Sequence, residues 1–423
     1  MEQNRYSERK KSHSMGREKR RFVGGMEDLS KLYDKECDRK GNAIYIHIPF
    51  CSKICTFCSM RRELSPCNPE YADMIIRHID KISETPFVKT CDIDAVYFGG
   101  GTPTSMEKKD LVRILEKLKS SFLLAPDCEI TMETTLSELS PEKLKILMES
   151  GLNRLSAGIQ TFSTRVRELL GRVGDGNFAV ERMKEYIDTG LSDISMDIIY
   201  NYPGQTLEEL QYDIGIMKTL DIAGFSLYSL ISMENSLLSA LHPEDMNIND
   251  DMERERLLFD TIAGEMRRDG YEFLEITKMV KPGRDSYRYI KARNTGKYTI
   301  PLGAGAGGEI MGGAVMNPID IDQYGEFTHN PMKKMVPVMK DEYNKINKAV
   351  SSLQLLKVNP GDFPPDSVSD MEKLFKDLIC EGYFNKEGND YHLTDKGIFY
   401  GNNISMDLWN YFTGKEDSEK TQR

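Results

Sequence analysis

From residue 43 onward, short apolar runs rich in β-branched and aromatic residues alternate with longer helical patterns. The strand-like runs cover residues 43–48, 94–98, 128–133, 154–159, 193–200 and 224–231. The helical patterns between them cover residues 69–85, 107–120, 141–150, 177–189 and 207–219. Repeated alternation of this kind predicts parallel strands joined by right-handed crossovers. We therefore expect an α/β fold in which six strand–helix units form a complete or partial (β/α)6 barrel of the TIM type.

The pattern changes beyond residue 250. A helix over residues 252–268 and a strand over 271–277 precede a glycine-rich stretch at 303–308, and the end of the chain reads as helix, strand and helix. We predict four regions along the chain: a polar N-terminal extension (1–40), a core barrel (41–250), a segment that completes the barrel and carries a glycine-rich substrate region (251–365), and a C-terminal α+β or winged-helix-like unit (366–415). The extension, with a basic run at 17–21, is expected to be a mobile tail packed by a few apolar residues.

Polar motifs fall where the predicted strands end. A cysteine-rich loop follows the first strand, and Gly99-Gly100-Gly101-Thr102-Pro103 follows the second. The next four strands end at or near Glu133, Gln160, Asp197 and Ile231. Catalytic residues of TIM-type barrels gather at the carboxyl ends of the strands. The sequence thus predicts one convergent site built from all six strands.

Composition narrows the class of protein. The net charge of −11 over 423 residues argues against a nucleic-acid partner, which would need a clustered basic face. No run approaches the roughly 18 apolar residues of a membrane helix, and the N-terminus has no signal-peptide pattern. We therefore expect a cytoplasmic protein with reduced thiols. Eight cysteines in a chain of this length do not read as a disulfide framework, and we interpret five of them as ordinary thiols: Cys37, Cys67, Cys91, Cys128 and Cys380.

The other three cysteines, Cys51, Cys55 and Cys58, have the spacing C-x3-C-x2-C. Three thiolates on one short loop can bind three irons of a [4Fe–4S] cubane, which leaves the fourth iron open to an external ligand. The alternatives are a zinc site or coincidence. Zinc sites usually pair C-x2-C units or add histidine, and the sequence has no second pair. We interpret the triad as the ligands of a cluster with an open iron.

Five segments carry a resemblance to known proteins. They read YIHIPFC at residues 45–51, the cysteine triad itself, GGGTPT at 99–104, RLSAGIQ at 154–160 and MDIIYNYPGQT at 196–206. Together they resemble the radical S-adenosylmethionine (SAM) superfamily and, within it, the HemN-like family of oxygen-independent coproporphyrinogen III oxidases and their heme-handling and methyltransferase relatives. The similarity runs through residues 43–232 and continues more loosely to the C-terminus. It implies an enzyme whose cluster binds SAM through the open iron and cleaves it reductively.

The resemblance also implies roles for individual residues. Tyr45 would pack beside SAM and the cluster, and the methionyl end of SAM would meet Gly100, Gly101 and Thr102. The ribose and the carboxylate would be lined by Glu133, Gln160, Arg172 and Asp197. Phe57 and Ile231 would border the adenine. Some family members bind a second SAM, so one or two molecules are expected.

Two departures from the family pattern and one local similarity bear on the substrate. Ser59 and Met60 follow Cys58, where members that decarboxylate coproporphyrinogen carry Cys-Gly-Cys. Heme-chaperone members carry histidine at the position of Gly308. The glycine-rich stretch, a second glycine pair and Asn317 resemble members that methylate heme and open its ring.

We therefore expect a tetrapyrrole substrate, either heme or coproporphyrinogen, and favour anaerobic heme methylation and ring opening. The alternatives are oxidative decarboxylation of coproporphyrinogen, methyl transfer by a radical SAM methyltransferase, and heme binding by a chaperone without turnover. A low-potential electron donor such as flavodoxin or ferredoxin is the expected protein partner.

Overall fold

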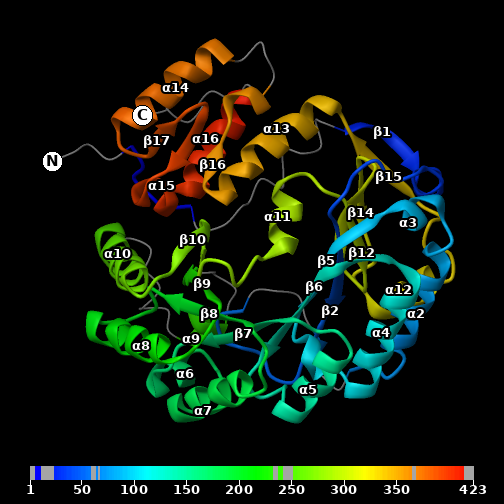
Figure 1. The fold of residues 1–423 in the computed structure, drawn as a ribbon, viewed down its shortest axis with the longest axis horizontal. Coiled ribbons are helices and arrows are strands. Elements are labelled where there is room, and N and C mark those ends of the chain that lie inside the picture. Colours follow the sequence, from blue (N-terminus) through cyan, green and yellow to red (C-terminus); the bar gives the residue numbers. More distant parts are fainter. Residues whose placement is uncertain are drawn as a thin grey trace.

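The computed structural model describes residues 5–10, 23–58, 63–64, 67–231, 237–241, 251–363 and 368–413. In this part of the chain, a 13-stranded sheet has the strand order β1-β15-β14-β13-β12-β2-β5-β6-β7-β8-β9-β11-β10 (Figure 1). All neighbours from β12 through β9 pair in parallel. The outer strands pair antiparallel on both sides. The sheet therefore curves as a TIM-like barrel but keeps two free edges, at β1 and β10.

The six predicted strands are confirmed. They are β2 (Asn42–Ile48), β5 (Asp92–Gly100), β6 (Leu123–Thr135), β7 (Arg154–Gln160), β8 (Asp193–Tyr200) and β9 (Gly224–Ser229). A seventh parallel strand, β12 (Thr299–Leu302), pairs with β2 on the side away from β5. The antiparallel strands that extend the sheet are β1 (Val23–Asp28), β10 (Glu272–Glu275), β11 (Lys278–Val280), β13 (Gly307–Ile310), β14 (Gly313–Met316) and β15 (Met335–Met339).

The predicted helices cover the outside of the parallel strands. They are α2 (Tyr71–Ile82), α4 (Lys108–Ser121), α5 (Pro141–Glu149), α7 (Gly176–Ile187), α8 (Leu207–Thr219) and α10 (Met252–Arg268). Local signals fix where two of them begin. The Ser140 side chain accepts from the Lys143 N–H at the start of α5, and Thr206 and Glu209 form a reciprocal capping box at the start of α8. Every residue of β7 is buried, as expected for a parallel strand covered on both faces.

Shorter elements connect this framework or fill it. They are β3 (Phe50–Cys51), β4 (Glu63–Leu64), α1 (Leu29–Tyr33), α3 (Pro86–Thr90), α6 (Thr164–Leu169), α9 (Leu237–Leu241), α11 (Arg288–Asn294), α12 (Ile321–Phe327) and α13 (Asp341–Ser352). Helix α11 closes the inside of the barrel, where the Tyr289 ring stacks on Tyr97 with a centroid distance of 4.6 Å. None of the helices in the described ranges is both long enough and apolar enough to cross a membrane.

A small C-terminal unit lies over one side of the barrel, next to α10 and β10 (Figure 1, upper left). Its helices are α14 (Val368–Cys380), α15 (Asp395–Phe399) and α16 (Gly401–Thr413), and its three-stranded sheet is formed by β16 (Lys357–Val358), β18 (Asp390–Leu393) and β17 (Phe384–Glu387). Helix α16 packs on α13, where the Trp409 and Tyr343 rings are 5.6 Å apart. The mixed α+β composition agrees with the sequence-based expectation.

The described parts of the N-terminal extension are packed against the fold. The Tyr6 hydroxyl donates to Asp407 Oδ2 (2.8 Å), and Arg9 donates to the Phe399 carbonyl (2.7 Å) and the Tyr200 hydroxyl (2.6 Å). Strand β1 joins the sheet edge beside β15. Packing through a few apolar side chains was expected of this tail, and charged side chains such as Arg9 add partners far along the chain. The basic run at 17–21 lies outside the described residues, and the four domain boundaries stay a prediction.

Candidate active site

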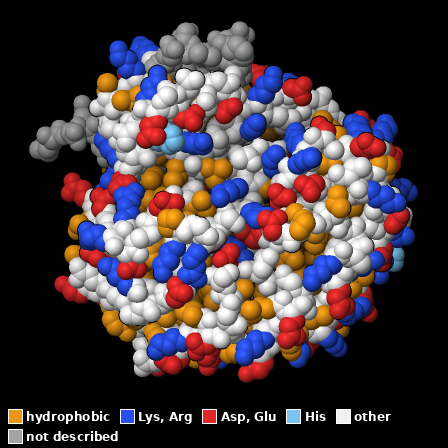
Figure 2. All heavy atoms as spheres, in the orientation of Figure 1, with side chains coloured by type: hydrophobic (Ala, Val, Ile, Leu, Met, Phe, Trp, Pro, Cys, Tyr) orange, Lys and Arg blue, Asp and Glu red, His pale blue; other side chains and the backbone are white. Residues whose placement is uncertain are grey.

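A cavity of about 410 Å³ opens at the carboxyl ends of the parallel strands, between the barrel and the C-terminal unit. Figure 2 shows hydrophobic side chains in the recess beside that unit. All the residues that the sequence nominated for the site line this cavity except Tyr45. They are Cys51, Cys55, Phe57, Cys58, Gly100, Gly101, Thr102, Glu133, Gln160, Arg172, Asp197 and Ile231. Strand topology thus brings together residues that lie up to 180 positions apart in the sequence.

Tyr45 lies one layer behind the cavity wall. Its hydroxyl is 2.9 Å from His47 Nδ1, and its ring stacks on Tyr289 at a centroid distance of 5.8 Å. A side chain at Gly99 would meet the Tyr45 ring at 3.2 Å, and one at Gly100 would meet the His47 ring at 2.6 Å. Tyr45 and His47 therefore support the glycine turn from below.

The cysteine loop is held by backbone hydrogen bonds to the glycine turn. The Gly101 N–H donates to the Ile48 carbonyl and the Thr102 N–H to the Phe50 carbonyl, both at 2.7 Å. A Cβ atom at Gly101 would lie 2.6 Å from that Phe50 carbonyl oxygen, so only glycine allows this approach. The turn after β5 therefore positions Cys51 directly.

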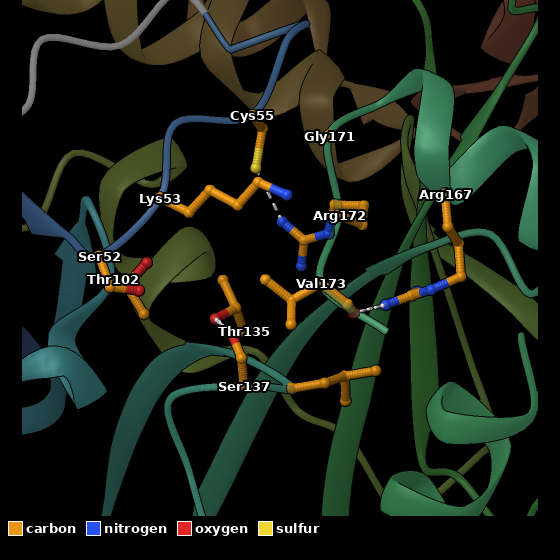
Figure 3. A pocket seen from close by; sticks show the side chains of 11 residues that line it. Ser52, Lys53, Cys55, Thr102, Thr135, Ser137, Arg167, Gly171, Arg172 and Val173 are labelled. Atoms are coloured by element: carbon orange, nitrogen blue, oxygen red, sulfur yellow. Dashed lines mark hydrogen bonds between the residues drawn. The ribbon is translucent and has the colours of Figure 1, made fainter. Parts of the chain in front are cut away.

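Arg172 faces the cysteine loop from the other side. Its Nη1 donates to Cys55 Sγ at 3.0 Å, and its Nη2 donates to the Gly158 carbonyl. Figure 3 shows this guanidinium pointing at the Cys55 thiol, with the Lys53 side chain alongside in this view. The Arg172 Nε is buried with no hydrogen-bond partner in the structure. A buried guanidinium N–H without a partner is available to an anionic group such as a carboxylate.

Two carboxylates face the same cavity. Glu133 accepts from the Tyr97 hydroxyl (2.6 Å) and from the Gly100 N–H (3.2 Å). Burial raises the pKa of Glu133 to about 7, with the charge of Asp197 adding to the shift and the hydrogen bond from Tyr97 opposing it. Burial also raises the pKa of Asp197, and Lys278 partly offsets that effect. Burial makes the ionised form of both carboxylates costly, and a nearby positive charge would offset that cost. The site therefore suits a cationic ligand.

Below these carboxylates, the barrel interior holds an ionic cluster that sequence reasoning missed. Asp285 accepts from Arg154 Nε (2.8 Å) and Nη2 (3.0 Å), and Lys278 Nζ lies 3.0 Å from Asp285 Oδ2. All three side chains are at most 1% exposed. Strand register places Lys278 opposite Ser226, which is itself opposite Asp197, so the cluster lies on the inner face beside the site.

The other side of the cavity is largely apolar. Besides the nominated residues, its wall includes Ile199, Leu227, Tyr228, Leu230, Ile276, Ile398 and Phe399. The Thr394 hydroxyl accepts from the Gly397 N–H (3.1 Å) at the start of α15, which carries Ile398 and Phe399. The sequence pattern of this helix could not show that Ile398 and Phe399 face the cavity, because that depends on how the C-terminal unit packs on the barrel.

The donor set fits an iron–sulfur cubane. The three thiols of the triad line one cavity, and none of the eight cysteines forms a disulfide. In the described part of the chain, no three His, Cys, Asp or Glu side chains converge closely enough to hold a single metal ion. A cubane does not need that convergence, because each thiolate binds a different iron. The unpartnered Arg172 Nε and the two carboxylates fit the charged groups of SAM.

Comparison with known proteins agrees with this site. The sequence model of the radical SAM superfamily matches residues 45–214. Anaerobilin synthase of Escherichia coli O157:H7 is 26% identical over 89% of this chain and 86% of its own length. The heme chaperone HemW of Bacillus subtilis is 28% identical over 85% of this chain and 97% of its own.

The fold is also shared with a solved structure. Coproporphyrinogen III oxidase (HemN) from Escherichia coli superimposes with a TM-score of 0.74, covering 96% of this chain and 97% of that one at 20% identity. At that identity the likeness speaks for the fold, whereas the matched superfamily region spans the cysteine loop, the glycine turn, Glu133 and Asp197. Residues 45–214 thus form a radical SAM domain, whose cofactors are a [4Fe–4S] cluster and SAM, and the chain as a whole is similar to HemN-like proteins.

Proposed function

We propose that the enzyme acts on a tetrapyrrole and that its reaction is anaerobic heme methylation and ring opening. The observation that carries the proposal is the cavity itself, in which the cysteine triad and the SAM-binding candidates share one space with an apolar wall. The relatives that match most of the chain are named for anaerobilin synthesis and for heme handling. Flat, largely apolar macrocycles are the class of ligand that such a wall suits.

Within this proposal, the residues around the cavity have distinct tasks. When bound, the cluster and SAM supply one-electron chemistry that breaks a carbon–sulfur bond of the sulfonium. Cys51, Cys55 and Cys58 anchor the cluster, Arg172 pairs with the SAM carboxylate, and the backbone of the glycine turn receives its methionyl end. The acceptors for the ammonium group and ribose hydroxyls are Glu133, Gln160 and Asp197, and the adenine is bordered by Phe57 and Ile231. A low-potential flavodoxin or ferredoxin is the proposed electron donor.

The charges in the cavity wall favour heme over coproporphyrinogen. Three cations, Arg9, Lys53 and Arg172, line the described part of the wall. Arg9 already pairs with the buried Glu255, and Arg172 is assigned to SAM. Among these lining cations, only Lys53 is neither ion-paired with a described residue nor assigned to SAM. A substrate with four propionates would need more positive partners than this, because buried carboxylates require pairing.

Gly308 supports turnover rather than chaperoning. Family members that carry heme have histidine at this position, but here a Cβ atom would lie 2.1 Å from the Thr299 carbonyl oxygen. No side chain fits there without moving the backbone of β12. Gly308 and the rest of the glycine-rich stretch also lie outside the residues that line the cavity. The other departure, Ser59 and Met60, falls outside the described residues.

The proposal is tested by anaerobic incubation of the cluster-loaded enzyme with heme, SAM and a strong reductant. We expect SAM consumption and a linear, methylated tetrapyrrole in the product mass spectrum. A parallel incubation with coproporphyrinogen should release no carbon dioxide. Decarboxylation of coproporphyrinogen would contradict the proposed reaction and support a coproporphyrinogen oxidase. Stable heme retention with no SAM consumption would contradict it and support a heme chaperone. The Cys55→Ala variant serves as the protein that can hold heme but cannot turn it over.

SAM affinity is expected to depend on pH through Glu133. The folded enzyme without SAM holds the pKa of this carboxyl at about 7, and a cationic ligand stabilises its ionised form. At a pH below this pKa, SAM binding must release the proton of the Glu133 carboxyl. SAM affinity should therefore fall by up to about tenfold for each pH unit below the pKa. Calorimetric titration of the cluster-loaded enzyme with SAM between about pH 6 and pH 8 measures both the affinity and the released proton.

Glu133→Gln is the matched control for this experiment. It keeps the hydrogen-bonding shape of the side chain and removes the titration, so its weaker binding should be nearly flat over the same pH range. Wild-type affinity that does not change between about pH 6 and pH 8 would contradict a role for Glu133 in holding the cation.

A further inference from the structure

Two cysteines that the site does not use lie together at the opposite end of the barrel. Cys37 belongs to the loop between α1 and β2, and Cys91 ends α3 directly before β5. Strands β2 and β5 are parallel neighbours, so both cysteines are at the amino ends of the strands, away from the cavity. More than 50 residues separate them in the sequence, and neither belongs to a family motif.

Hydrogen bonds to both sequence neighbours of Cys91 hold Cys37 beside it. The Cys37 N–H donates to Thr90 Oγ1 at 2.8 Å, which fixes the loop beside the residue preceding Cys91. Asn42 is 0% exposed and donates from Nδ2 to Cys37 Sγ at 3.4 Å. The same Nδ2 donates to the Asp92 carbonyl at 3.2 Å, so Cys37 is tied to both residues that flank Cys91, and the two thiols interact electrostatically.

We propose that Cys37 and Cys91 form a reversible oxidation site, which a peroxide-class oxidant converts to a disulfide. Peroxide first oxidises the Cys37 thiol to a sulfenic acid and is itself reduced to water. The Cys91 sulfur then attacks the Cys37 sulfur, the S–O bond breaks, and a second water leaves. In sum, two thiols and one hydrogen peroxide give one disulfide and two waters, so two electrons pass from sulfur to oxygen.

The order of the two steps follows from the surroundings of each thiol. Cys37 is partly exposed, on a loop that contains Gly41, whereas Cys91 is fully buried. Burial raises the pKa of Cys91, so its thiolate is scarce and it is the poorer first nucleophile. Cys37 is therefore the residue that meets the oxidant, and Cys91 is the resolving partner. In an enzyme with an oxygen-sensitive cluster, such a pair takes up oxidant at a distance from the cavity.

Peptide mapping of the full-length, cluster-loaded enzyme tests this proposal. The protein is treated with a small excess of hydrogen peroxide, alkylated under denaturing conditions and digested without reductant. We expect one cross-linked species that joins the Cys37 and Cys91 peptides and that dithiothreitol reverses. Cys128 is the matched control, because it is also a buried thiol with a pKa raised by burial, but no other cysteine contributes to its surroundings.

The Cys37→Ser and Cys91→Ser variants separate the steps. Cys91→Ser should stop at oxidised Cys37, and Cys37→Ser should leave Cys91 alkylated as a thiol. Both should cleave SAM as the wild type does, since neither residue is near the cavity. Full alkylation of both cysteines in the treated wild type would overturn the proposal. So would cross-links of Cys37 or Cys91 to other cysteines in place of the expected pair.

Discussion

Replacing Cys55 with alanine is expected to abolish SAM cleavage, by more than about a thousandfold, because the cluster would lose one of its three proposed ligands and could not bind SAM productively. The structure makes Cys55 the most informative of the three. Its thiol lies 3.0 Å from Arg172 Nη1, and a Cβ atom at Gly171 would lie 3.6 Å from the Cys55 Cα, so the loop packs here through backbone atoms that alanine keeps. Iron and sulfide content after anaerobic reconstitution should fall together with the formation of 5′-deoxyadenosine.

Cys380→Ala provides the matched control for that loss. Cys380 is the exposed cysteine at the end of α14 in the C-terminal unit, and it takes no part in the cavity wall. The control variant should bind the same iron and sulfide as the wild type and consume SAM at the same rate. A Cys55→Ala protein with full iron content and normal SAM cleavage would remove the basis for the proposed chemistry. Arg172→Lys extends the test, because a lysine keeps the charge but loses the planar donor set and should weaken SAM binding.

The strands and their end motifs could be predicted from sequence because the information is local. Each of the six runs is continuous and β-rich, and each is followed by a turn motif whose chemistry does not depend on distant residues. Parallel topology then forces the motifs to one edge of the sheet. This is why Glu133 and Asp197, which come from different strands, could be assigned to one site before the fold was known.

Other parts of the fold depend on long-range packing and carry little local signal. Strand β12 has four residues and helix α11 has seven, too few to show a period. The pairing of Arg154 with Asp285 spans 131 positions and is set only when α11 enters the barrel. The sequence also did not show where the Tyr45 side chain lies. Its motif predicts that Tyr45 is near the cluster, but not that it lies behind the cavity wall.

The glycine-rich stretch has a structural task that its sequence pattern did not indicate. Residues 303–308 were expected to belong to a substrate region, which stays a prediction; in the structure they lead from β12 into β13, outside the cavity wall. Gly303 has φ of +93°, and a Cβ atom there would lie 2.2 Å from the His47 carbonyl oxygen. The Tyr71 hydroxyl also donates to that carbonyl (2.8 Å). Glycine is required at position 303 because the two backbones approach so closely. Gly303 therefore contributes to the site only indirectly, by supporting β2, the strand that carries Tyr45 and His47.

Asp285→Asn is expected to destabilise the enzyme by about 3–5 kcal/mol, because it leaves two buried cations without their carboxylate. Burial alone would raise the pKa of Asp285, but Arg154 and Lys278 hold it well below its usual range. The ion pairs therefore contribute stability throughout the range above the unfolded pKa of about 4, and lose it only as the pH falls through the lowered folded value. Equilibrium unfolding in urea near neutral pH measures the loss.

Two further variants decide whether uncompensated charge is the cause. Lys278 can shed its proton, since burial lowers its pKa and Asp285 offsets this only partly, whereas Arg154 stays charged. Adding Arg154→Met to Asp285→Asn should therefore recover part of the lost stability, because the remaining cation can neutralise itself. Glu84→Gln breaks a pair with Lys89 whose side chains are 80% and 57% exposed, and it should leave the unfolding midpoint unchanged. If the double variant loses as much stability as Asp285→Asn and Arg154→Met do together when measured singly, the two residues are not coupled. The loss then arises from packing and not from uncompensated charge.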